Sequence, residues 1–388
     1  MLPADATVVL LQHHGLDNLR GKTGLAMLRY RKGPIPVVVD PAHAGANLRA
    51  ITGIPRSTAV VGSLREALPL LAAPEQAVAV VGLAPSGGAL PVEMRDDLLA
   101  ALDAGMSLAS GLHTPLGRDP DLAARLRPGA WIWDLRQEPR GLSVATAQAA
   151  QVPGHRLLAV GTDMSVGKMS ACLELQAAAL RRGLDARFVA TGQAGILISG
   201  AGVPLDAIRV DYAAGGVEEA VLAAAAAATP RTLLLVEGQG SLCHPGSTAT
   251  LPLLRGSQPT ALLLVHRAGQ TSIRTAPHIP IPPLAELIAV VEALAALGRP
   301  ATTSPAGMAT VPERPAPKVG AIALNTAHLS AEEARLAMEE VGALTGLPCA
   351  DPVRQGGEAL LDAFLNEALD GLDTGRAGRA SEGIRTPV

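Results

Sequence analysis

The segment LLAVGTDMSVGKMS (Leu157–Ser170) constrains the fold more than any other part of this 388-residue chain. An apolar run suited to a β-strand leads into a glycine-rich turn, Lys168 follows the second glycine, and a helical stretch begins there. Successive backbone N–H groups in such a turn, together with the helix N-terminus, form a cradle for an anion, and the lysine adds a cation. The sequence therefore predicts a phosphate-binding loop whose cofactor-binding residues are Gly161, Thr162, Asp163, Ser165, Val166, Gly167, Lys168, Met169 and Ser170.

The spacing of this loop departs from the plain phosphate-loop pattern. Five residues separate Gly161 from Gly167, where four are standard. This longer form, GTD-x-x-VGK, resembles the loop of dethiobiotin synthetase and related ATP-dependent enzymes.

The residue after the lysine bears on the chemistry. Met169 stands where a nucleotide-hydrolysing enzyme places the Ser or Thr whose hydroxyl ligates Mg²⁺. A thioether is a poor ligand for a hard cation, and Ser170 is turned away by about 100° along the helix. The loop is expected to hold phosphate but to assemble a Mg–ATP site badly. This favours a phosphate-bearing cofactor that is not cleaved between its phosphates, and no metal ligand is predicted.

Apolar runs and Ala/Leu-rich helical stretches alternate along the chain, which is typical of parallel α/β architecture. We expect a Rossmann-like N-terminal domain (1–145), a P-loop NTPase-like domain with a mainly parallel sheet (146–370) and a disordered tail (371–388). The expected strands are Thr7–Leu11, Ile35–Val39, Thr58–Val61, Ala77–Gly82, Met106–Ala109, Trp131–Asp134, Arg156–Val160, Ala186–Ala190, Thr232–Val236, Thr260–Val265 and Val319–Leu324. The expected helices are Gly21–Tyr30, Ser63–Leu71, Val92–Ala104, Lys168–Arg182, Val217–Ala228, Leu284–Leu297 and Ser330–Leu344, and Arg299–Pro317 is expected to be a mobile Pro-rich loop.

The first expected strand is not followed by the G-x-G-x-x-G pattern of a nicotinamide-binding domain. Asp40, at the end of VVVD, suits a ribose-binding acid, although that signal is weak alone. The N-terminal half is therefore interpreted as Rossmann-like in shape only.

Composition excludes several classes of partner. Lys and Arg number 32 against 35 Asp and Glu, so a net charge of −3 gives no basic field for nucleic acid or anionic lipid. Aromatic residues make up 2% of the chain, too few for a base-stacking surface. Cys172, Cys243 and Cys349 have no metal-ligand spacing and indicate reduced thiols. With no signal peptide and no apolar run near the roughly 18 residues of a membrane span, a cytoplasmic location is expected.

A second glycine-rich loop carries the candidate catalytic residues. TLLLVEGQGSLCHPG (Thr232–Gly246) is a strand that ends in Glu237, where such folds place a metal or water ligand, and the alternative is a helix cap. Histidine side chains can exchange protons near neutrality, so His244 is a candidate base, with a structural role as the alternative. Cys243 is the weaker nucleophile candidate.

Another strand end, FVATGQAGILISGAG, supplies the predicted substrate-binding residues Thr191, Gly192, Gln193 and Gly195. The glycines permit close backbone approach, and the Gln193 amide both donates and accepts hydrogen bonds. Asp211, further along, is either a helix N-cap or a substrate contact.

The combined motifs resemble one family of bacterial proteins, long catalogued as of unknown function, that includes D-glutamate N-acetyltransferase. The matching segments include KTGLAMLRY, VVVDPAHAG, GLAPSGG, SGLH, IWDLR, ALNT and DPVR as well as the three loops above. The resemblance implies acetyl transfer from acetyl-CoA to the amino group of D-glutamate or a similar D-amino acid. Glu237 or His244 then serves as base beside Lys168, backbone N–H groups of the Gly192–Gly195 or Gly238–Gly240 loops hold the oxyanion, and Arg354 or Arg267 binds substrate carboxylates.

Two other functions stay open. One is an ATP- and Mg²⁺-dependent ligase or kinase of the dethiobiotin synthetase kind, and the other is a non-enzymatic nucleotide or CoA sensor. The expected partner is a small-molecule substrate, and a homo-oligomer is expected because such enzymes commonly form one.

Overall fold

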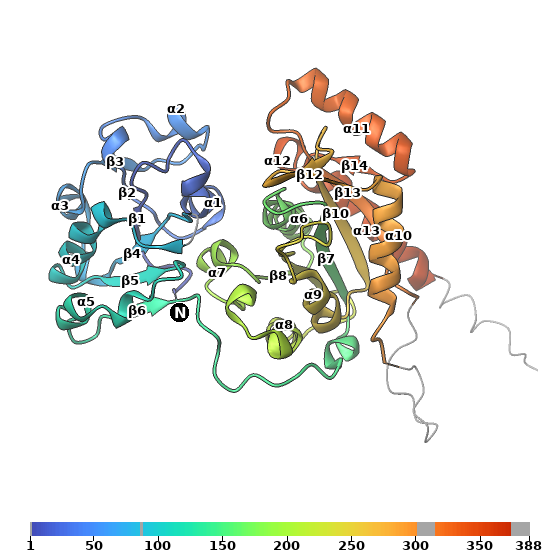
Figure 1. Ribbon diagram of the computed structural model, residues 1–388, viewed down its shortest axis with the longest axis horizontal. Coiled ribbons are helices and arrows are strands. Elements are labelled where there is room, and N and C mark those ends of the chain that lie inside the picture. The colour runs from blue at the N-terminus through green and yellow to red at the C-terminus, as the bar shows by residue number, and fades with distance from the viewer. Residues whose placement is uncertain (1, 86–87, 301–314, 374–388) are drawn as a thin grey trace, which may run out of the picture. The chain divides into compact units, whose positions relative to one another are not determined.

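The computed structural model describes residues 2–85, 88–300 and 315–373. The chain forms two compact units (Figure 1). Unit 1 contains residues 1–142 and 190–210, and unit 2 contains residues 143–189 and 211–388. The predicted domain boundary at residue 145 stays a prediction. Segment 190–210 follows that boundary in the sequence but belongs to unit 1.

Unit 1 is built on a six-stranded parallel sheet with the order β3-β2-β1-β4-β5-β6. Strand β1 pairs with β2 on one side and β4 on the other, with Val9 opposite Val37 and Ala79. This doubly wound order confirms the Rossmann-like expectation and puts the topological switch point at the carboxyl ends of β1 and β4. The strands are β1 (Val8–Leu11), β2 (Val37–Val39), β3 (Ala59–Val61), β4 (Val78–Val81), β5 (Ser107–Ser110) and β6 (Ile132–Asp134).

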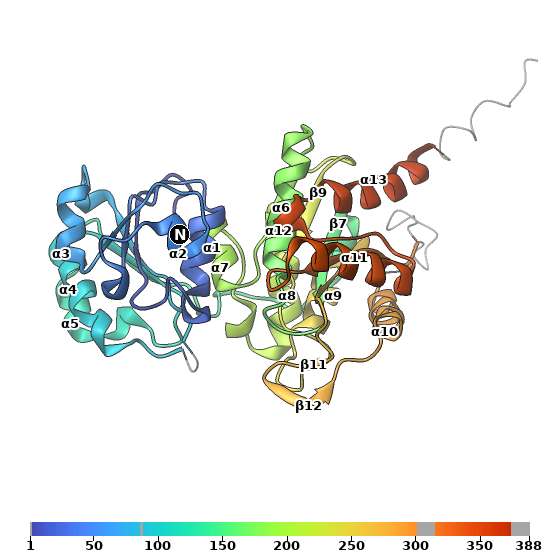
Figure 2. The ribbon, with the colours of Figure 1, turned by 90° about the horizontal axis from the view of Figure 1, so that it is seen from above.

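Helices cover both faces of this sheet. Figures 1 and 2 show α3, α4 and α5 on one face and α1 and α7 on the other. The helices of unit 1 are α1 (Lys22–Tyr30), α2 (Leu48–Thr52), α3 (Leu64–Ala67), α4 (Arg95–Asp103), α5 (Pro120–Ala124) and α7 (Gln193–Ser199). Short 3₁₀ turns lie at Leu19–Gly21, Pro41–His43, Leu68–Leu70, Pro74–Gln76, Val92–Met94, Leu116–Arg118 and Leu205–Ala207.

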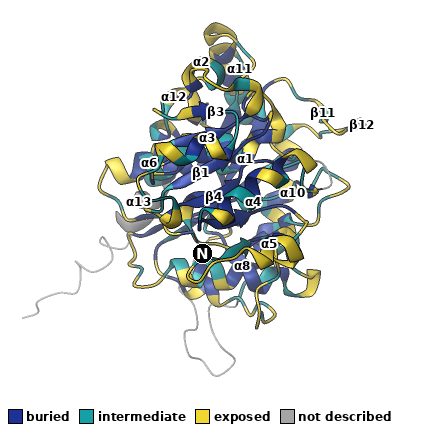
Figure 3. Ribbon diagram, turned by 90° about the vertical axis from the view of Figure 1, so that its left-hand side faces the viewer, coloured by how far each residue is buried: buried dark blue, intermediate teal, exposed yellow. Residues whose placement is uncertain are grey.

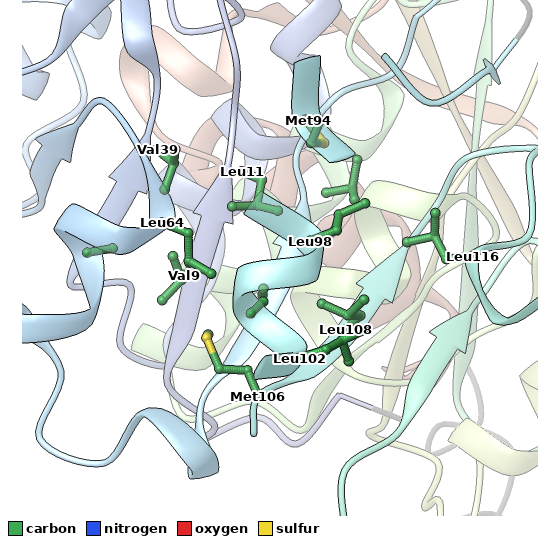
Figure 4. Packing of buried hydrophobic residues seen from close by; sticks show 14 of the residues in the cluster. Val9, Leu11, Val39, Leu64, Met94, Leu98, Leu102, Met106, Leu108 and Leu116 are labelled. Atoms are coloured by element: carbon green, nitrogen blue, oxygen red, sulfur yellow. The ribbon is translucent and has the colours of Figure 1, made fainter. Parts of the chain in front are cut away.

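The core of unit 1 lies between the sheet and α4. Leu98 and Leu102, four residues apart on α4, belong to one buried cluster with Val9 and Leu11 of β1, and Leu102 lies beside Leu108 of β5 (Figure 4). All four side chains are fully buried, and each such burial contributes roughly 1.5–3 kcal/mol. Figure 3 shows the same pattern, with buried strands inside and exposed residues on the surrounding helices.

The switch point of unit 1 is filled by the chain itself. The fully buried Gln12 donates from Nε2 to the carbonyl oxygens of Gly21 (2.8 Å) and Gly15 (3.2 Å). A Cβ atom at Gly24 or Gly82 would overlap the Gln12 amide. In dinucleotide-binding folds the glycines at this point leave room for a pyrophosphate, whereas here they leave room for Gln12.

Asp40 does not present a free carboxylate to a ribose. Its side chain is fully buried, and its two oxygens accept the N–H groups of His14 (3.0 Å), Ala42 (3.1 Å) and Leu16 (3.2 Å). The three backbone donors engage this carboxylate, which thereby holds the loop after β1, and the weak ribose signal at Asp40 gains no support from this geometry.

Unit 2 contains a second six-stranded parallel sheet with the order β14-β13-β10-β7-β9-β8, which confirms the predicted class. The strand before the phosphate-binding loop, β7, lies inside this sheet between β10 and β9. The strands are β7 (His155–Gly161), β8 (Ala186–Val189), β9 (Leu233–Val236), β10 (Ala261–Arg267), β13 (Val319–Asn325) and β14 (Cys349–Ala350), and an antiparallel hairpin joins β11 (Ser272–Ile273) to β12 (Ala276–Pro280).

One face of this sheet packs against α6 and α13, through side chains such as Leu175 and Leu361. The opposite face meets α9, which contacts β7. The helices of unit 2 are α6 (Lys168–Arg181), α8 (Val210–Ala224), α9 (Thr250–Ser257), α10 (Leu284–Ala296), α11 (Ala331–Thr345), α12 (Pro352–Gln355) and α13 (Glu358–Asp373), with a 3₁₀ turn at Gln148–Gln151.

Each expected strand is present, but several elements differ from the prediction. Helix α8 begins at Val210, not at Val217, so Asp211 lies inside its first turn and is not its N-cap. Gly215 and Gly216 made this stretch look non-helical, yet a Cβ at Gly215 would overlap the Ser143 carbonyl, so the glycine serves close packing. Short β11, β12 and β14 and helices α2, α5, α7, α9, α12 and α13 were not expected.

Two expectations fall largely outside the described residues. Most of the Pro-rich loop Arg299–Pro317 lies there, as does the expected disordered tail from residue 374 onward. Residues 371–373 form the end of α13. Within the described ranges, no helix combines the length and apolar character that crossing a membrane needs.

We expect Gly21→Ala to destabilise unit 1 by about 1–3 kcal/mol, because its new Cβ would overlap the Gly15 carbonyl and the buried Gln12 amide. Trp131 and Trp133 are the only tryptophans and both belong to unit 1, so urea unfolding followed by tryptophan fluorescence reports on this unit. Gly62→Ala is the matched control, because its Cβ first meets the exposed Glu66 carboxylate at 3.2 Å, which can move. An equal loss in both variants would contradict this account.

Candidate functional site

The predicted phosphate-binding loop joins β7 to α6 and is here called the P-loop (residues 161–168). Ser165 (φ 57°) and Gly167 (φ 118°) both adopt left-handed backbone conformations, which are uncommon for serine and turn successive N–H groups toward one side. Within the described chain, the N–H groups of Ser165, Val166 and Gly167 donate to no protein acceptor. The loop therefore offers unused backbone donors next to a helix N-terminus, which suits an anion.

Lys168 is almost completely buried and donates from Nζ to the carbonyl oxygen of Asp163 (2.9 Å). Burial lowers the pKa of Lys168 to about 8, and the nearby charges of Asp163 and Glu237 oppose that shift. Gly161 leaves space for this side chain, because a Cβ there would lie 2.8 Å from Nζ. The Lys168 ammonium is thus held by a hydrogen bond to a carbonyl oxygen of the P-loop itself.

Side chains from the neighbouring strand β10 and the segment after it hold the P-loop in place. The Asp163 carboxylate accepts hydrogen bonds from the Gln270 amide (2.7 Å), the Arg274 N–H (2.9 Å) and the Met164 N–H (2.6 Å). His266 Nδ1 lies 2.9 Å from Thr162 Oγ1, and burial lowers the pKa of His266 to about 4, so this imidazole is neutral at pH 7.

Strand β13 adds a further contact, since the Asn325 amide donates to the Val166 carbonyl (2.9 Å). No sequence pattern pointed to a role for Gln270, His266 or Asn325. Asn325 lies in the quoted ALNT segment, but neither its spacing nor its composition indicated a contact with the P-loop.

Met169 and Ser170 lie in the first turn of α6, both partly buried. The thioether therefore follows the buried lysine directly. The P-loop also contains one carboxylate, that of Asp163, and this group already accepts three hydrogen bonds from the protein.

Glu237 directly follows β9 and is 4% exposed. Its N–H donates to the Val189 carbonyl (2.9 Å), and its Oε1 accepts from the Gln239 amide (3.3 Å). The next residue, Gly238, lies against the Lys168 side chain, because a Cβ there would approach Lys168 Cδ to 2.7 Å. Glu237 caps no helix, since α9 begins only at Thr250. The structure thus brings Glu237 and Lys168 close to each other.

His244 is held at both ring nitrogens. Its Nδ1 accepts the Gly246 N–H (3.0 Å), so the neutral ring carries its proton on Nε2, which donates to Thr275 Oγ1 (2.8 Å). Its neighbour Cys243 is half-buried, and burial raises the pKa of the thiol, which disfavours a nucleophilic thiolate.

The predicted substrate-binding residues fall in different units. Thr191, Gly192, Gln193 and Gly195 belong to unit 1, where Gln193 begins α7 and its side chain contacts Gly111. Arg354 belongs to unit 2, where its guanidinium donates to Thr326 Oγ1 (3.2 Å) and to the carbonyls of Thr326 (3.0 Å) and Leu329 (2.8 Å). A role for these residues in substrate binding stays a prediction.

We expect the affinity of the P-loop for a phosphate ligand to fall as the pH rises through about 8. The ammonium of Lys168 loses its proton there, while phosphate groups with a second pKa near 6 are already ionised. Titration calorimetry with coenzyme A from pH 7 to 9 is predicted to show up to tenfold weaker binding per pH unit above 8. Lys168→Met should bind weakly throughout, and a flat profile for the unaltered protein would refute the prediction.

Two family models match the chain. Residues 143–361 match the P-loop domain of a family described as a domain of unknown function, DUF1611, and residues 41–138 match its Rossmann-like domain. The chain is also similar to a crystal structure of a DUF1611 family protein from Anabaena variabilis, with a TM-score of 0.84 and 50% identity over 93% of this chain and 99% of that one.

Two curated relatives carry the name D-glutamate N-acetyltransferase. The protein from Tritonibacter scottomollicae is 39% identical over 291 residues, 74% of this chain and 80% of that protein. The protein from a Pseudoalteromonas species is 34% identical over 284 residues, 73% of this chain and 79% of that protein. The resemblance drawn from the sequence motifs is confirmed, and the chain belongs to the DUF1611 family, with a Rossmann-like N-terminal domain and a P-loop C-terminal domain.

Proposed function

We propose that this protein is an N-acetyltransferase that transfers the acetyl group of acetyl-CoA to the amino group of D-glutamate or a similar D-amino acid. The names of two relatives that each match over 70% of the chain support this reaction. The structural observation that carries the choice of ligand is Met169, which directly follows the buried Lys168 in a P-loop with unused backbone donors.

The P-loop fits a pyrophosphate that is bound and not cleaved. Lys168 and the N–H groups of residues 165–167 supply positive charge and donors. Hydrolysis of ATP needs Mg²⁺ bridging the phosphates, and its usual Ser or Thr ligand is replaced here by a thioether. Acetyl-CoA carries such a pyrophosphate and reacts at its distant thioester.

In the proposed reaction the thioester C–S bond breaks and a C–N bond forms to the amino group. The substrate ammonium first gives a proton to a base, and the departing thiolate takes up a proton. We favour Glu237 as this base, because His244 already uses its free lone pair to accept the Gly246 N–H. Lys168 beside Glu237 keeps that carboxylate close to a positive charge.

The loop after β9 also supplies donors for the oxyanion of the tetrahedral intermediate. Gly240 has φ 63°, and within the described chain the N–H groups of residues 238–240 donate to no protein acceptor. Preorganised N–H donors of this kind stabilise charge that develops on a carbonyl oxygen. The loop thus combines a base and oxyanion donors within four residues.

We expect coenzyme A and acetyl-CoA to raise the unfolding temperature without Mg²⁺, and acetyl-CoA with D-glutamate to release free thiol. ATP with Mg²⁺ is expected to release no phosphate with any carboxylate substrate. Met169→Thr is the matched variant, because it restores the hydroxyl at the metal position. Magnesium-dependent ATP turnover by the unaltered protein would instead support the ligase or kinase, and tight binding with no turnover would support the sensor.

Glu237→Gln is expected to lower kcat about 10²–10⁴-fold while leaving acetyl-CoA affinity within a few-fold, because the amide keeps the shape but accepts no proton. His244→Asn is expected to cost less than tenfold, since the ring serves the loop. Steady-state kinetics and titration calorimetry on both variants decide the assignment. A larger kcat loss for His244→Asn would reverse it.

A further inference from the structure

The chain that follows β10 runs directly beside the P-loop. Strand β10 pairs with β7 up to the P-loop, with Val265 opposite Gly161. Residues 266–275, here called the β10-exit segment, comprise the last two residues of β10, which still pair with β13, and the chain that then leaves the sheet next to the cradle. They lead into the β11–β12 hairpin, whose turn is Arg274–Thr275.

This segment is fixed to the P-loop at several points. His266 contacts Thr162 (2.9 Å), and both the Gln270 amide (2.7 Å) and the Arg274 N–H (2.9 Å) donate to Asp163. Thr275 Oγ1 bonds the His244 ring (2.8 Å). The hairpin turn thus joins the P-loop to the loop that follows Glu237.

Two guanidinium groups of this segment have no protein partner. The side chains of Arg267 and Arg274 make no hydrogen bond or ion pair with the part of the chain that the structure describes, and Arg274 is exposed. Several arginines elsewhere in unit 2 are paired with acids, as Arg181, Arg182, Arg187 and Arg335 are. A fixed backbone with a free, planar donor group suits recognition of a phosphate or carboxylate.

The balance of charges around the P-loop indicates what Arg267 and Arg274 can contribute. The positive charge of Lys168 is offset by the carboxylates of Asp163 and Glu237, both nearly buried. A ligand with several phosphate groups therefore needs further cations at this edge of the sheet. Arg267 and Arg274 supply two.

We propose that Arg274, assisted by Arg267, forms a second anion subsite that binds a phosphate group separate from the pyrophosphate on the P-loop. This inference rests on the proposed function, under which that group is the 3′-phosphate of acetyl-CoA. The 3′-phosphate and the pyrophosphate are attached to the same ribose. When the P-loop binds the pyrophosphate, the 3′-phosphate therefore lies near the P-loop, where the Arg274 side chain is available to bind it. Coenzyme A is then distinguished from its 3′-dephospho form and from ADP.

The test compares the affinities of coenzyme A and 3′-dephospho-coenzyme A, by titration calorimetry on the full chain. The unaltered protein should bind coenzyme A about tenfold or more tightly than the dephospho form, as expected for a charge-assisted hydrogen bond. Arg274→Ala should lose this preference, with unchanged affinity for the dephospho form. Because the contact with Asp163 uses the Arg274 backbone, the alanine variant keeps it.

Arg255→Ala is the matched control, because Arg255 is an exposed arginine of α9 outside this segment. It should leave both affinities unchanged, and Arg274→Lys should keep part of the preference. The inference is overturned if Arg274→Ala weakens both ligands equally, changes neither, or raises only the KM for D-glutamate. If the unaltered protein binds neither form of coenzyme A, the proposed function itself fails, and that result is distinct from the others.

Discussion

The buried ammonium of Lys168 is the charge around which unit 2 is arranged. It lies under a loop whose carbonyl it contacts, and glycines at positions 161 and 238 leave the space it occupies. Taking such a charge out of water is costly unless neighbouring groups compensate. The Asp163 carbonyl and the charges of Asp163 and Glu237 provide this compensation, yet the pKa of the lysine still falls. A bound anion would complete the compensation of the Lys168 charge. The residues around Lys168 therefore have the character of an anion-binding site.

The two units show that a glycine–lysine spacing alone does not make an anion cradle. Unit 1 contains G-x₅-G-K between Gly15 and Lys22, the same spacing as Gly161 to Lys168. Gly21, however, has φ −89°, whereas Gly167 has φ 118°. The carbonyls of Gly15 and Gly21 accept hydrogen bonds from the Gln12 amide, so this loop receives a donor. Among the described residues, the P-loop N–H groups instead have no protein acceptor, so the two backbone conformations present opposite polar groups, carbonyls in unit 1 and N–H groups in unit 2.

Holding a phosphate and cleaving it place different demands on a P-loop. Binding needs N–H donors and a cation, and both are present. Cleavage needs a hydroxyl for Mg²⁺, and Met169 removes it without disturbing the donors. The same P-loop is thereby suited to bind the phosphate groups of a ligand that reacts at a different, distant part of the molecule. The loop after β9, with Glu237 and its free N–H groups, is then available for acyl chemistry.

The sequence by itself determined the two parallel sheets, the P-loop and the position of Glu237, because apolar periodicity and strand–glycine–helix order are local properties. It misplaced the start of α8, since Gly215 favours a loop by propensity and becomes helical only against Ser143. It could not show that the Asp40 carboxylate accepts backbone N–H groups of the loop after β1, because these contacts depend on how that loop folds back over β2. Only the tertiary structure revealed that Gln270, His266 and Asn325 hold the P-loop, because these residues lie over 100 positions away and meet it through strand pairing.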